Sequence, residues 1–278
     1  MRNRTFRDDG NYFDDEGLLC SLEGGQGSGK STSLATMGYE DYTGLAKIGT
    51  HKKVIANSHM NTAMIPEFRF MTLDFLIQNL TGHNNELDNS ILLVDEAQKT
   101  IDSSARTRES RDILYMLEEI RKRKMQCYMS SQRLNKIDLR AREMLDLRGV
   151  CKTRNEKPCR KCRAERTDMN APISYSNPTL YKGEICERCS GYGKVAHTTV
   201  TFKKLTGKNP ILVGGLLIDF DEGIIKQIVT GQSTRWHPSS TFTIGPFMAN
   251  DYWHLFDTHE RMAIQAKKLS NLSTAEVV

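Results

Sequence analysis

The residues with the clearest chemical signature lie in a glycine-rich bend after an apolar run. The spacing is Gly-x-x-x-x-Gly-Lys-Ser, from Gly24 to Ser31, and in this pattern successive backbone N–H groups surround a phosphate. Lys30 would reach the β and γ phosphates, and the Ser31 hydroxyl would hold Mg²⁺. A bend that merely turns the chain is disfavoured, because a strand pattern precedes it and a helix pattern follows. The bend is predicted to bind ATP through Gly25, Gln26, Gly27, Ser28, Gly29, Lys30, Ser31 and Thr32.

A pair of carboxylates follows a second apolar run, "ILLVDEA" at 91–97. The carboxyl end of a buried strand is where open α/β sheets place their ligands. With a phosphate loop upstream, Asp95 is predicted to hold Mg²⁺ through water and Glu96 to polarise the attacking water as general base. The alternative is an acidic pair that only starts a helix.

Gln132 ends a third run, "QCYMSSQ" at 126–132. In phosphate-loop enzymes with an adjacent Asp-Glu pair, such a strand commonly lies between the loop strand and the acidic strand. Gln132 would then sense the γ-phosphate or orient water. Without the other two motifs, Gln132 would be a solvated polar residue that closes a strand.

Strand patterns alternate with helix patterns along the first 150 residues. Strands are predicted at 17–23, 53–59, 90–98 and 126–132. Helices are predicted from about Lys30, over 72–80, and over 110–124 with a core stripe of Ile113, Leu114, Leu117 and Ile120. This alternation predicts a three-layer α/β fold, in which helices cover a parallel sheet that carries the phosphate loop.

Length and composition limit the possible functions. The chain has 278 residues and a net charge of +5, which allows one large α/β core with a small appendage and tolerates a nucleic-acid partner without requiring one. No apolar run is long enough for a membrane span, and the polar N-terminus is neither a signal peptide nor a transit peptide. A soluble protein is therefore expected. Seven cysteines favour a reducing compartment and a metal over disulfides.

Four of the cysteines form two Cys-x-x-Cys pairs, separated by 23 residues: Cys159 with Cys162, and Cys186 with Cys189. Two such pairs make a tetrahedral four-thiolate Zn²⁺ site, the alternative being two unrelated redox motifs. Cys20 and Cys127 lie in apolar runs and are predicted to be packed thiols. No role is assigned to Cys151.

Basic residues gather beside the first cysteine pair. Residues 151–170 hold seven basic side chains and three acidic ones. The functional interpretation is a zinc-stapled hairpin that contacts DNA phosphates through Arg160, Lys161 and Arg163, and the alternative is a solvated basic face. A second run, "RKRK" at 121–124, ends a helix, where cations suit the helix dipole. Structural and DNA-binding roles both remain open for it.

Four segments together carry a family resemblance: "EGGQGSGKST", "LLVDEAQK", "EEIRKRKMQCYMSSQRLNKIDLRARE" and "NDYWHLFDTHE". They resemble the viral and archaeal genome-packaging ATPases of the FtsK/HerA superfamily and the related zonular-occludens-toxin-like ATPases of filamentous phages. The resemblance covers most of the chain in order, apart from about 151–197. It implies a P-loop NTPase of the RecA-like ASCE type, forming a ring, expected to be hexameric, that pumps DNA. Lys30, Ser31, Asp95, Glu96 and Gln132 would have the roles given above.

The resemblance also implies an arginine that acts across the subunit interface. In "NKIDLRARE", Arg140 and Arg142 follow an aspartate as in the family. Ring ATPases often present a neighbour's arginine from such a place, and its guanidinium stabilises transition-state charge at the γ-phosphate. The alternative is that both arginines pair with nearby carboxylates on a solvated helix. Those carboxylates are Asp138, Glu143 and Asp146, and the competing arginines are Arg106, Arg108 and Arg111.

The expected organisation is an ATPase core at 1–150, a zinc-binding hairpin at 151–197 and a completion of the core at 198–278. The function that the resemblance implies is ATP-driven translocation of double-stranded viral DNA into a capsid, with a capsid or portal-vertex protein as partner. The expected location is the host cytoplasm, and the virion if the motor is retained there.

Three competing functions are less favoured by the sequence. Because no membrane helix is expected, the phage extrusion ATPase is the second choice. A nucleotide-gated DNA-binding switch that turns over rarely is disfavoured by the presence of Glu96. A structural zinc protein with a vestigial loop is disfavoured because every expected ATPase residue is present.

Overall fold

The computed structural model describes residues 17–47, 49, 52–58, 60, 62, 64–70, 72, 87–99, 115, 117–120, 122–158, 180–181, 184–185, 194–237, 241–248 and 255. The phosphate loop, the acidic pair and the strand before Gln132 are all among them. Several predictions concern residues outside this set. They are nearly the whole helix at 72–80, most of the segment "NDYWHLFDTHE", Arg106, Arg108, Arg111, Ile113 and Leu114 of the predicted core stripe, the four paired cysteines, Arg160, Lys161 and Arg163.

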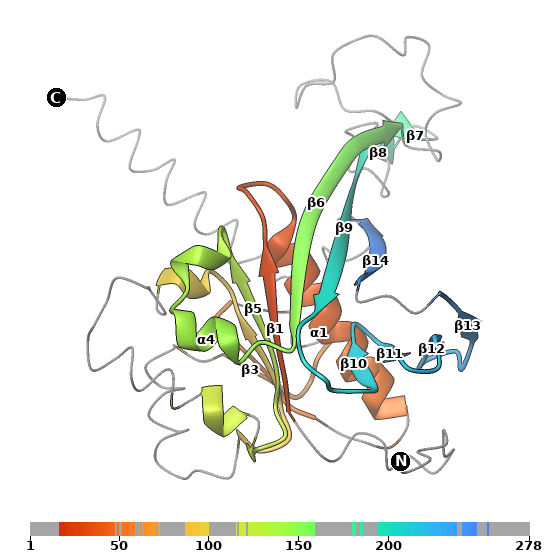
Figure 1. The fold of residues 1–278 in the computed structure, drawn as a ribbon. Helices are drawn as coiled ribbons and strands as arrows, with labels where there is room; N and C mark the ends of the chain where they lie inside the picture. The colour runs from red at the N-terminus through yellow and green to blue at the C-terminus, as the bar shows by residue number, and fades with distance from the viewer. Residues whose placement is uncertain are drawn as a thin grey trace, which may run out of the picture.

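A mixed sheet of eight strands, in the order β14-β9-β6-β1-β5-β4-β2-β3, forms the centre of the protein (Figure 1). The strands from β6 to β3 in this order are parallel to one another, and β9 and β14 extend the sheet in antiparallel fashion. The prediction of a parallel α/β sheet is confirmed for the six strands from β6 to β3, whereas the antiparallel strands β9 and β14 were not predicted. The strands are β1 (Leu18–Glu23), β2 (Val54–Ala56), β3 (Phe68–Phe70), β4 (Ile91–Val94), β5 (Gln126–Ser131), β6 (Leu147–Pro158), β9 (Lys194–Lys204) and β14 (Thr241–Met248).

Helices cover both faces of this sheet, which makes three layers. Strands β4 and β5 are buried along their whole length and β1 along nearly all of it, as expected for strands covered on both sides. On one face lies α1 (Lys30–Lys47), whose apolar side chains share a core with alternate residues of β1. On the other face α4 (Leu139–Glu143) packs with the buried helical residues Leu117 and Ile120. The predicted helix start at Lys30 is confirmed.

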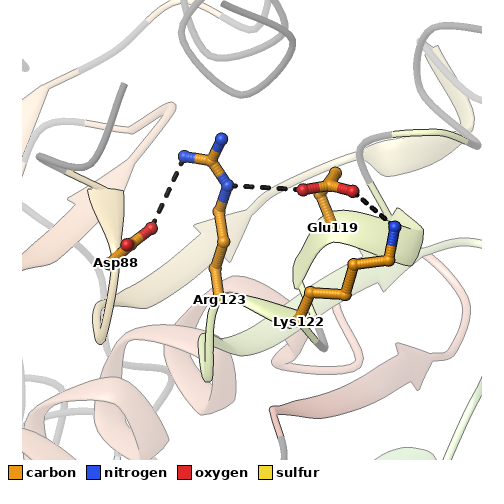
Figure 2. Close-up of polar contacts among 4 residues, drawn as sticks. All are labelled: Asp88, Glu119, Lys122 and Arg123. Atoms are coloured by element: carbon orange, nitrogen blue, oxygen red, sulfur yellow. Dashed lines mark hydrogen bonds and ion pairs between the residues drawn. The ribbon is translucent and has the colours of Figure 1, made fainter. Parts of the chain in front are cut away.

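An ion-pair network stabilises the edge of the sheet where β4 and β5 begin (Figure 2). The Nε atom of Arg123 lies 3.7 Å from Glu119 Oε2, and its Nη1 lies 3.5 Å from Asp88 Oδ1. Lys122 Nζ lies 2.7 Å from Glu119 Oε1. These contacts tie the end of a helix to the turn before β4, far from the phosphate loop at the other edge. For Lys122 and Arg123 the structural interpretation is therefore favoured.

A second, four-stranded antiparallel sheet was not anticipated from the sequence. The apolar run at 211–220 forms its first hairpin, which turns at Gly214 and Gly215 with φ of 57° and 71°. Glycine tolerates this left-handed conformation at little cost. Within the described part of the chain, no helix is long and apolar enough to cross a membrane. The strands of the second sheet are β10 (Ile211–Val213), β11 (Leu216–Asp219), β12 (Ile224–Gln227) and β13 (Ser233–Arg235).

A buried carboxylate joins the second sheet to the core. Asp41 on α1 is fully buried; it accepts a hydrogen bond of 2.7 Å from the Gly215 N–H and another from the Tyr128 hydroxyl on β5. Burial raises the pKa of the Asp41 carboxyl to about 6, although both hydrogen bonds oppose the rise. The carboxylate thus links α1, β5 and the β10–β11 turn. Its burial in the ionised form costs free energy, and this cost depends on pH.

Strands β6 and β9 continue beyond the rest of the sheet as a two-stranded extension (Figure 1). Pairing of β1 with β6 ends at Glu23 and Val150, whereas β6 and β9 stay paired out to Pro158 and Lys194. Pairing of β14 with β9 ends at Met248 and His197, so we call residues 155–158 and 194–196, which lie beyond both pairings, the arm. Near its outer end in Figure 1 lie the short strands β7 (Leu180–Tyr181) and β8 (Glu184–Ile185). The proposed domain boundaries at 150 and 197 therefore fall within continuous strands.

Candidate functional site

The phosphate loop lies at the carboxyl edge of the sheet, between β1 and α1. Its residues 25–27 are exposed. Gly27 and Gly29 have φ of 74° and 82°, a backbone conformation that residues with a Cβ rarely adopt. Lys30 Nζ donates hydrogen bonds of 2.9 Å to the carbonyls of Gly24 and Gly25. The ammonium group therefore lies inside the bend, and the positive end of α1 faces the same space.

Ser31 and Asp95, the two residues predicted to hold Mg²⁺, lie together. Ser31 Oγ donates a hydrogen bond of 2.8 Å to Asp95 Oδ2, although 64 residues separate them in sequence. A hydroxyl and a carboxylate are the hard oxygen ligands that Mg²⁺ prefers beside a phosphate. The pair therefore fits the ion chemically.

Glu96 follows Asp95 in a constrained backbone conformation. Its φ is 53°, which is uncommon for a residue with a Cβ and costs of order 1–3 kcal/mol. The backbone N–H of Glu96 donates to Ser130 Oγ at 2.9 Å and to Asp95 Oδ1 at 3.1 Å. The Ser130 hydroxyl in turn donates to Asp95 Oδ1. Ser130 on β5 thus stabilises the turn that presents both carboxylates. A short 3-10 helix, η3 (Ala97–Lys99), begins directly after this turn, so the acidic pair also precedes a helix start.

Asn57, just after β2, was missed in the sequence. Its Nδ2 donates to the Asp95 carbonyl at 2.9 Å, and its Oδ1 accepts from the Asp95 N–H at 2.8 Å. The Asn57 amide therefore holds the backbone of Asp95 on both sides of its Cα. The predicted strand at 53–59 contained Asn57, whereas β2 ends at Ala56 and leaves Asn57 at the edge of the sheet.

Gln132 lies at the same edge. Strand β5 pairs with β1 on one side and with β4 on the other, so the predicted strand position is confirmed. Gln132 itself is exposed. The turn after it is held by Glu23 at the end of β1, whose carboxylate accepts from the Leu134 N–H at 3.3 Å and from Arg148 Nε at 2.7 Å. This turn is therefore fixed against the strand that leads into the phosphate loop.

The arginines proposed to act across an interface lie on α4. Arg140 is exposed and Arg142 half-buried. Among the described residues, Arg142 Nε has no hydrogen-bond partner. Asp138 caps the helix by accepting from the Arg140 backbone N–H at 2.9 Å, and the buried Asp146 accepts from the Leu19 N–H at 2.9 Å. Both carboxylates thus carry structural hydrogen bonds, and whether either arginine serves a neighbouring site stays a prediction.

The described cysteines are packed thiols. Cys20, Cys127 and Cys151 are free and buried, which confirms the prediction for the first two. Burial raises the pKa of the Cys151 thiol to about 11, so it remains protonated near neutral pH. No group of three or more metal-ligating side chains occurs among the described residues. The four paired cysteines lie outside them, and the zinc site stays a prediction based on their spacing.

Comparisons with known proteins give distant likenesses. No family model and no curated protein matches the chain. Among solved structures, the genome packaging NTPase B204 from Sulfolobus turreted icosahedral virus 2, in complex with AMPPCP, is 18% identical with a TM-score of 0.37, over 50% of this chain and 76% of that one. The N-terminal domain of zonular occludens toxin from Neisseria meningitidis is 13% identical with a TM-score of 0.42, and the match covers 87% of this chain and 100% of that one. Both classes are those that the sequence motifs resemble. These values are too low to transfer a function.

Proposed function

We propose that the protein is an ATPase that uses hydrolysis to translocate double-stranded viral DNA into a capsid. The observation that carries the ATPase part is the hydrogen bond between Ser31 of the phosphate loop and Asp95, with Glu96 next in the chain. Motifs far apart along the chain meet there at one edge of the sheet. Such a convergence of a phosphate cradle, two oxygen ligands and a further carboxylate suits phosphoryl transfer to water.

Each residue of the site has a defined part in the proposed reaction. The N–H groups of residues 25–29 and the Lys30 ammonium bind the β and γ phosphates. Mg²⁺, held by Ser31 and Asp95, neutralises phosphate charge when it is bound. Glu96 accepts a proton from water as the water oxygen attacks the γ-phosphorus. The bond from that phosphorus to the β–γ bridging oxygen breaks, which yields ADP and inorganic phosphate. Gln132 orients the water or senses the γ-phosphate.

The DNA part of the proposal is supported by charge and by the position of the arm. The arm leads directly into the segment that contains the cysteine pairs and the basic residues Arg160, Lys161 and Arg163. Lysine and arginine side chains bind phosphate backbones without sequence preference, which suits a motor that must move along any sequence. A zinc site with four thiolates would stabilise this segment. We propose a ring of subunits, expected to be hexameric, around the duplex.

A phage-assembly extrusion ATPase and a DNA-binding switch with little turnover are the competing functions. The switch is disfavoured because Glu96 lies directly after Asp95, on a turn that Ser130 holds in place. A protein that only needed to bind nucleotide would have no use for a general base in that position.

The test is steady-state ATP hydrolysis with and without linear duplex DNA. The wild type is expected to hydrolyse ATP faster with DNA, Lys30→Ala to lose nucleotide binding, and Glu96→Gln to bind nucleotide but lose turnover. The control is Glu222→Gln, the same change at an exposed residue of the second sheet's β11–β12 turn, which is expected to behave as the wild type. Wild-type hydrolysis by Glu96→Gln would refute the general-base role, and hydrolysis unaffected by DNA would refute the coupling.

A further inference from the structure

Two threonines on the strands that lead to the arm touch the phosphate loop directly. Thr153 on β6 donates a hydrogen bond of 3.0 Å from its Oγ1 to the carbonyl of Gly27. Thr198 on β9 is the cross-strand partner of Thr153, and their hydroxyl oxygens lie 3.5 Å apart. The loop is thus hydrogen-bonded to a strand 126 residues further along the chain.

No space separates the loop from these strands. A Cβ on Gly29 would lie 2.2 Å from Thr198 Oγ1, and a Cβ on Gly24 would lie 3.0 Å from the Cys151 carbonyl oxygen. The contact follows from the pairing of the strands. The ladder of β1 with β6 ends at Glu23 and Val150, so the loop, which begins at Gly24, lies beside the β6 residues that follow Val150. A displacement of these strands therefore displaces the loop.

Irregular pairing flanks this contact: one register shift lies just beyond Thr153 on β6, and the other lies opposite Val200 and Thr198 on β9. In the ladder of β6 with β9 the register shifts between Arg154 and Lys157, and in the ladder of β14 with β9 it shifts between Ile244 and Phe247. Such bulges bend a strand and alter its twist. The two threonines thus lie at the junction between the regular sheet and the arm.

We propose that Thr153 is a positioning residue for the phosphate loop, and that through it nucleotide bound at the loop and duplex DNA bound to the segment that the arm carries change each other's affinity. The Gly27 carbonyl belongs to the peptide that carries the Ser28 N–H, which donates to the Gly25 carbonyl at 3.2 Å. The Thr153 hydrogen bond therefore fixes the orientation of the central peptide of the phosphate loop from its other side. Coupling between two binding sites is reciprocal by linkage. The identity of the arm's ligand rests on the proposed function; the contact with the loop does not.

Three variants test this inference. Thr153→Val removes the hydroxyl with little change of shape, and Thr153→Ser restores it. The control is Thr201→Val, because Thr201 on β9 is also exposed and makes a comparable hydroxyl contact of 3.1 Å with Thr243, away from the loop. Binding of ADP with Mg²⁺ is measured by calorimetry, and amide hydrogen exchange of the arm is measured with and without ADP.

Thr153→Val is expected to bind ADP about fivefold more weakly, the effect of one lost hydrogen bond. It is also expected to lose the change in arm exchange that ADP causes in the wild type, whereas Thr153→Ser and Thr201→Val keep both properties. With duplex DNA present, the DNA-induced shift in ADP affinity is expected to disappear in Thr153→Val alone.

Wild-type ADP affinity and a wild-type exchange response in Thr153→Val would overturn the inference. So would an equal loss in Thr201→Val, because the effect would then be a general one on the sheet. Failure of the proposed function has a different signature: the wild type would bind ADP and respond in the arm, yet fail to hydrolyse ATP or to respond to DNA. A wild type that binds no nucleotide would overturn both.

Discussion

Replacement of Asn57 by alanine is expected to slow ATP hydrolysis without unfolding the protein. The side chain makes two hydrogen bonds to the backbone of Asp95, of 2.9 Å and 2.8 Å. Each such bond contributes about 1 kcal/mol net. Loss of both bonds would remove about 2 kcal/mol of stabilisation from the position of the Asp95 backbone. This corresponds to about 30-fold in rate if the whole amount is lost from the stabilisation of the transition state.

The assay is ATP turnover at saturating ATP as a function of Mg²⁺ concentration. Asn57→Ala is expected to lower kcat by about one order of magnitude or somewhat more and to require more Mg²⁺, because the displaced Asp95 carboxylate is one of the two groups proposed to hold Mg²⁺, in its case through water. Asn135→Ala is the control, since Asn135 is exposed on the turn Leu134–Lys136. Thermal unfolding of each variant separates a local effect from a loss of fold. A wild-type kcat and Mg²⁺ dependence in Asn57→Ala would refute the positioning role.

Three further predictions concern stability, metal and assembly. The pKa of Asp41 is raised to about 6 from 3.8, so its protonated form contributes stability that is full below pH 3.8 and lost as pH rises through 6. Relative to Asp41→Asn, the free energy of unfolding of the wild type should fall by up to about 3 kcal/mol over this range; parallel curves in urea titrations would contradict the assignment. Purified protein should hold one Zn²⁺ per chain. Replacement of both Cys159 and Cys186 by serine should remove the ion and make the hairpin sensitive to protease; protein that is prepared without chelator and still contains no zinc would exclude the site. Finally, Arg142→Ala subunits mixed with Lys30→Ala subunits should regain hydrolysis if Arg142 acts across an interface, whereas mixed rings no more active than either variant would exclude that role.

The phosphate loop, the strands around it and the order of β1, β5 and β4 could be predicted from the sequence. Loop and strand signals are local: the glycine spacing, the apolar runs and the helix start at Lys30 lie within a few residues of one another. The position of β5 between its neighbours could be predicted because phosphate-loop enzymes with an adjacent Asp-Glu pair commonly place this strand between the loop strand and the acidic strand.

Contacts between distant segments could not be predicted in the same way. Asn57 reaches Asp95 across 38 residues and Thr153 reaches Gly27 across 126, and polar residues such as these have no pattern that distinguishes them from solvated ones. The second sheet was missed for a related reason: its strands are short, and its first hairpin looks like one apolar run interrupted by Gly214 and Gly215.

The measurement that tests the central claim most directly is displacement of a labelled third DNA strand from a linear duplex. A translocating ring removes the third strand as it passes, whereas a static DNA-binding protein does not. The wild type with ATP and Mg²⁺ is expected to release the third strand, and neither Glu96→Gln with ATP nor the wild type with a non-hydrolysable analogue should do so. Retention of the third strand by a wild-type protein that binds the duplex and hydrolyses ATP would contradict DNA translocation.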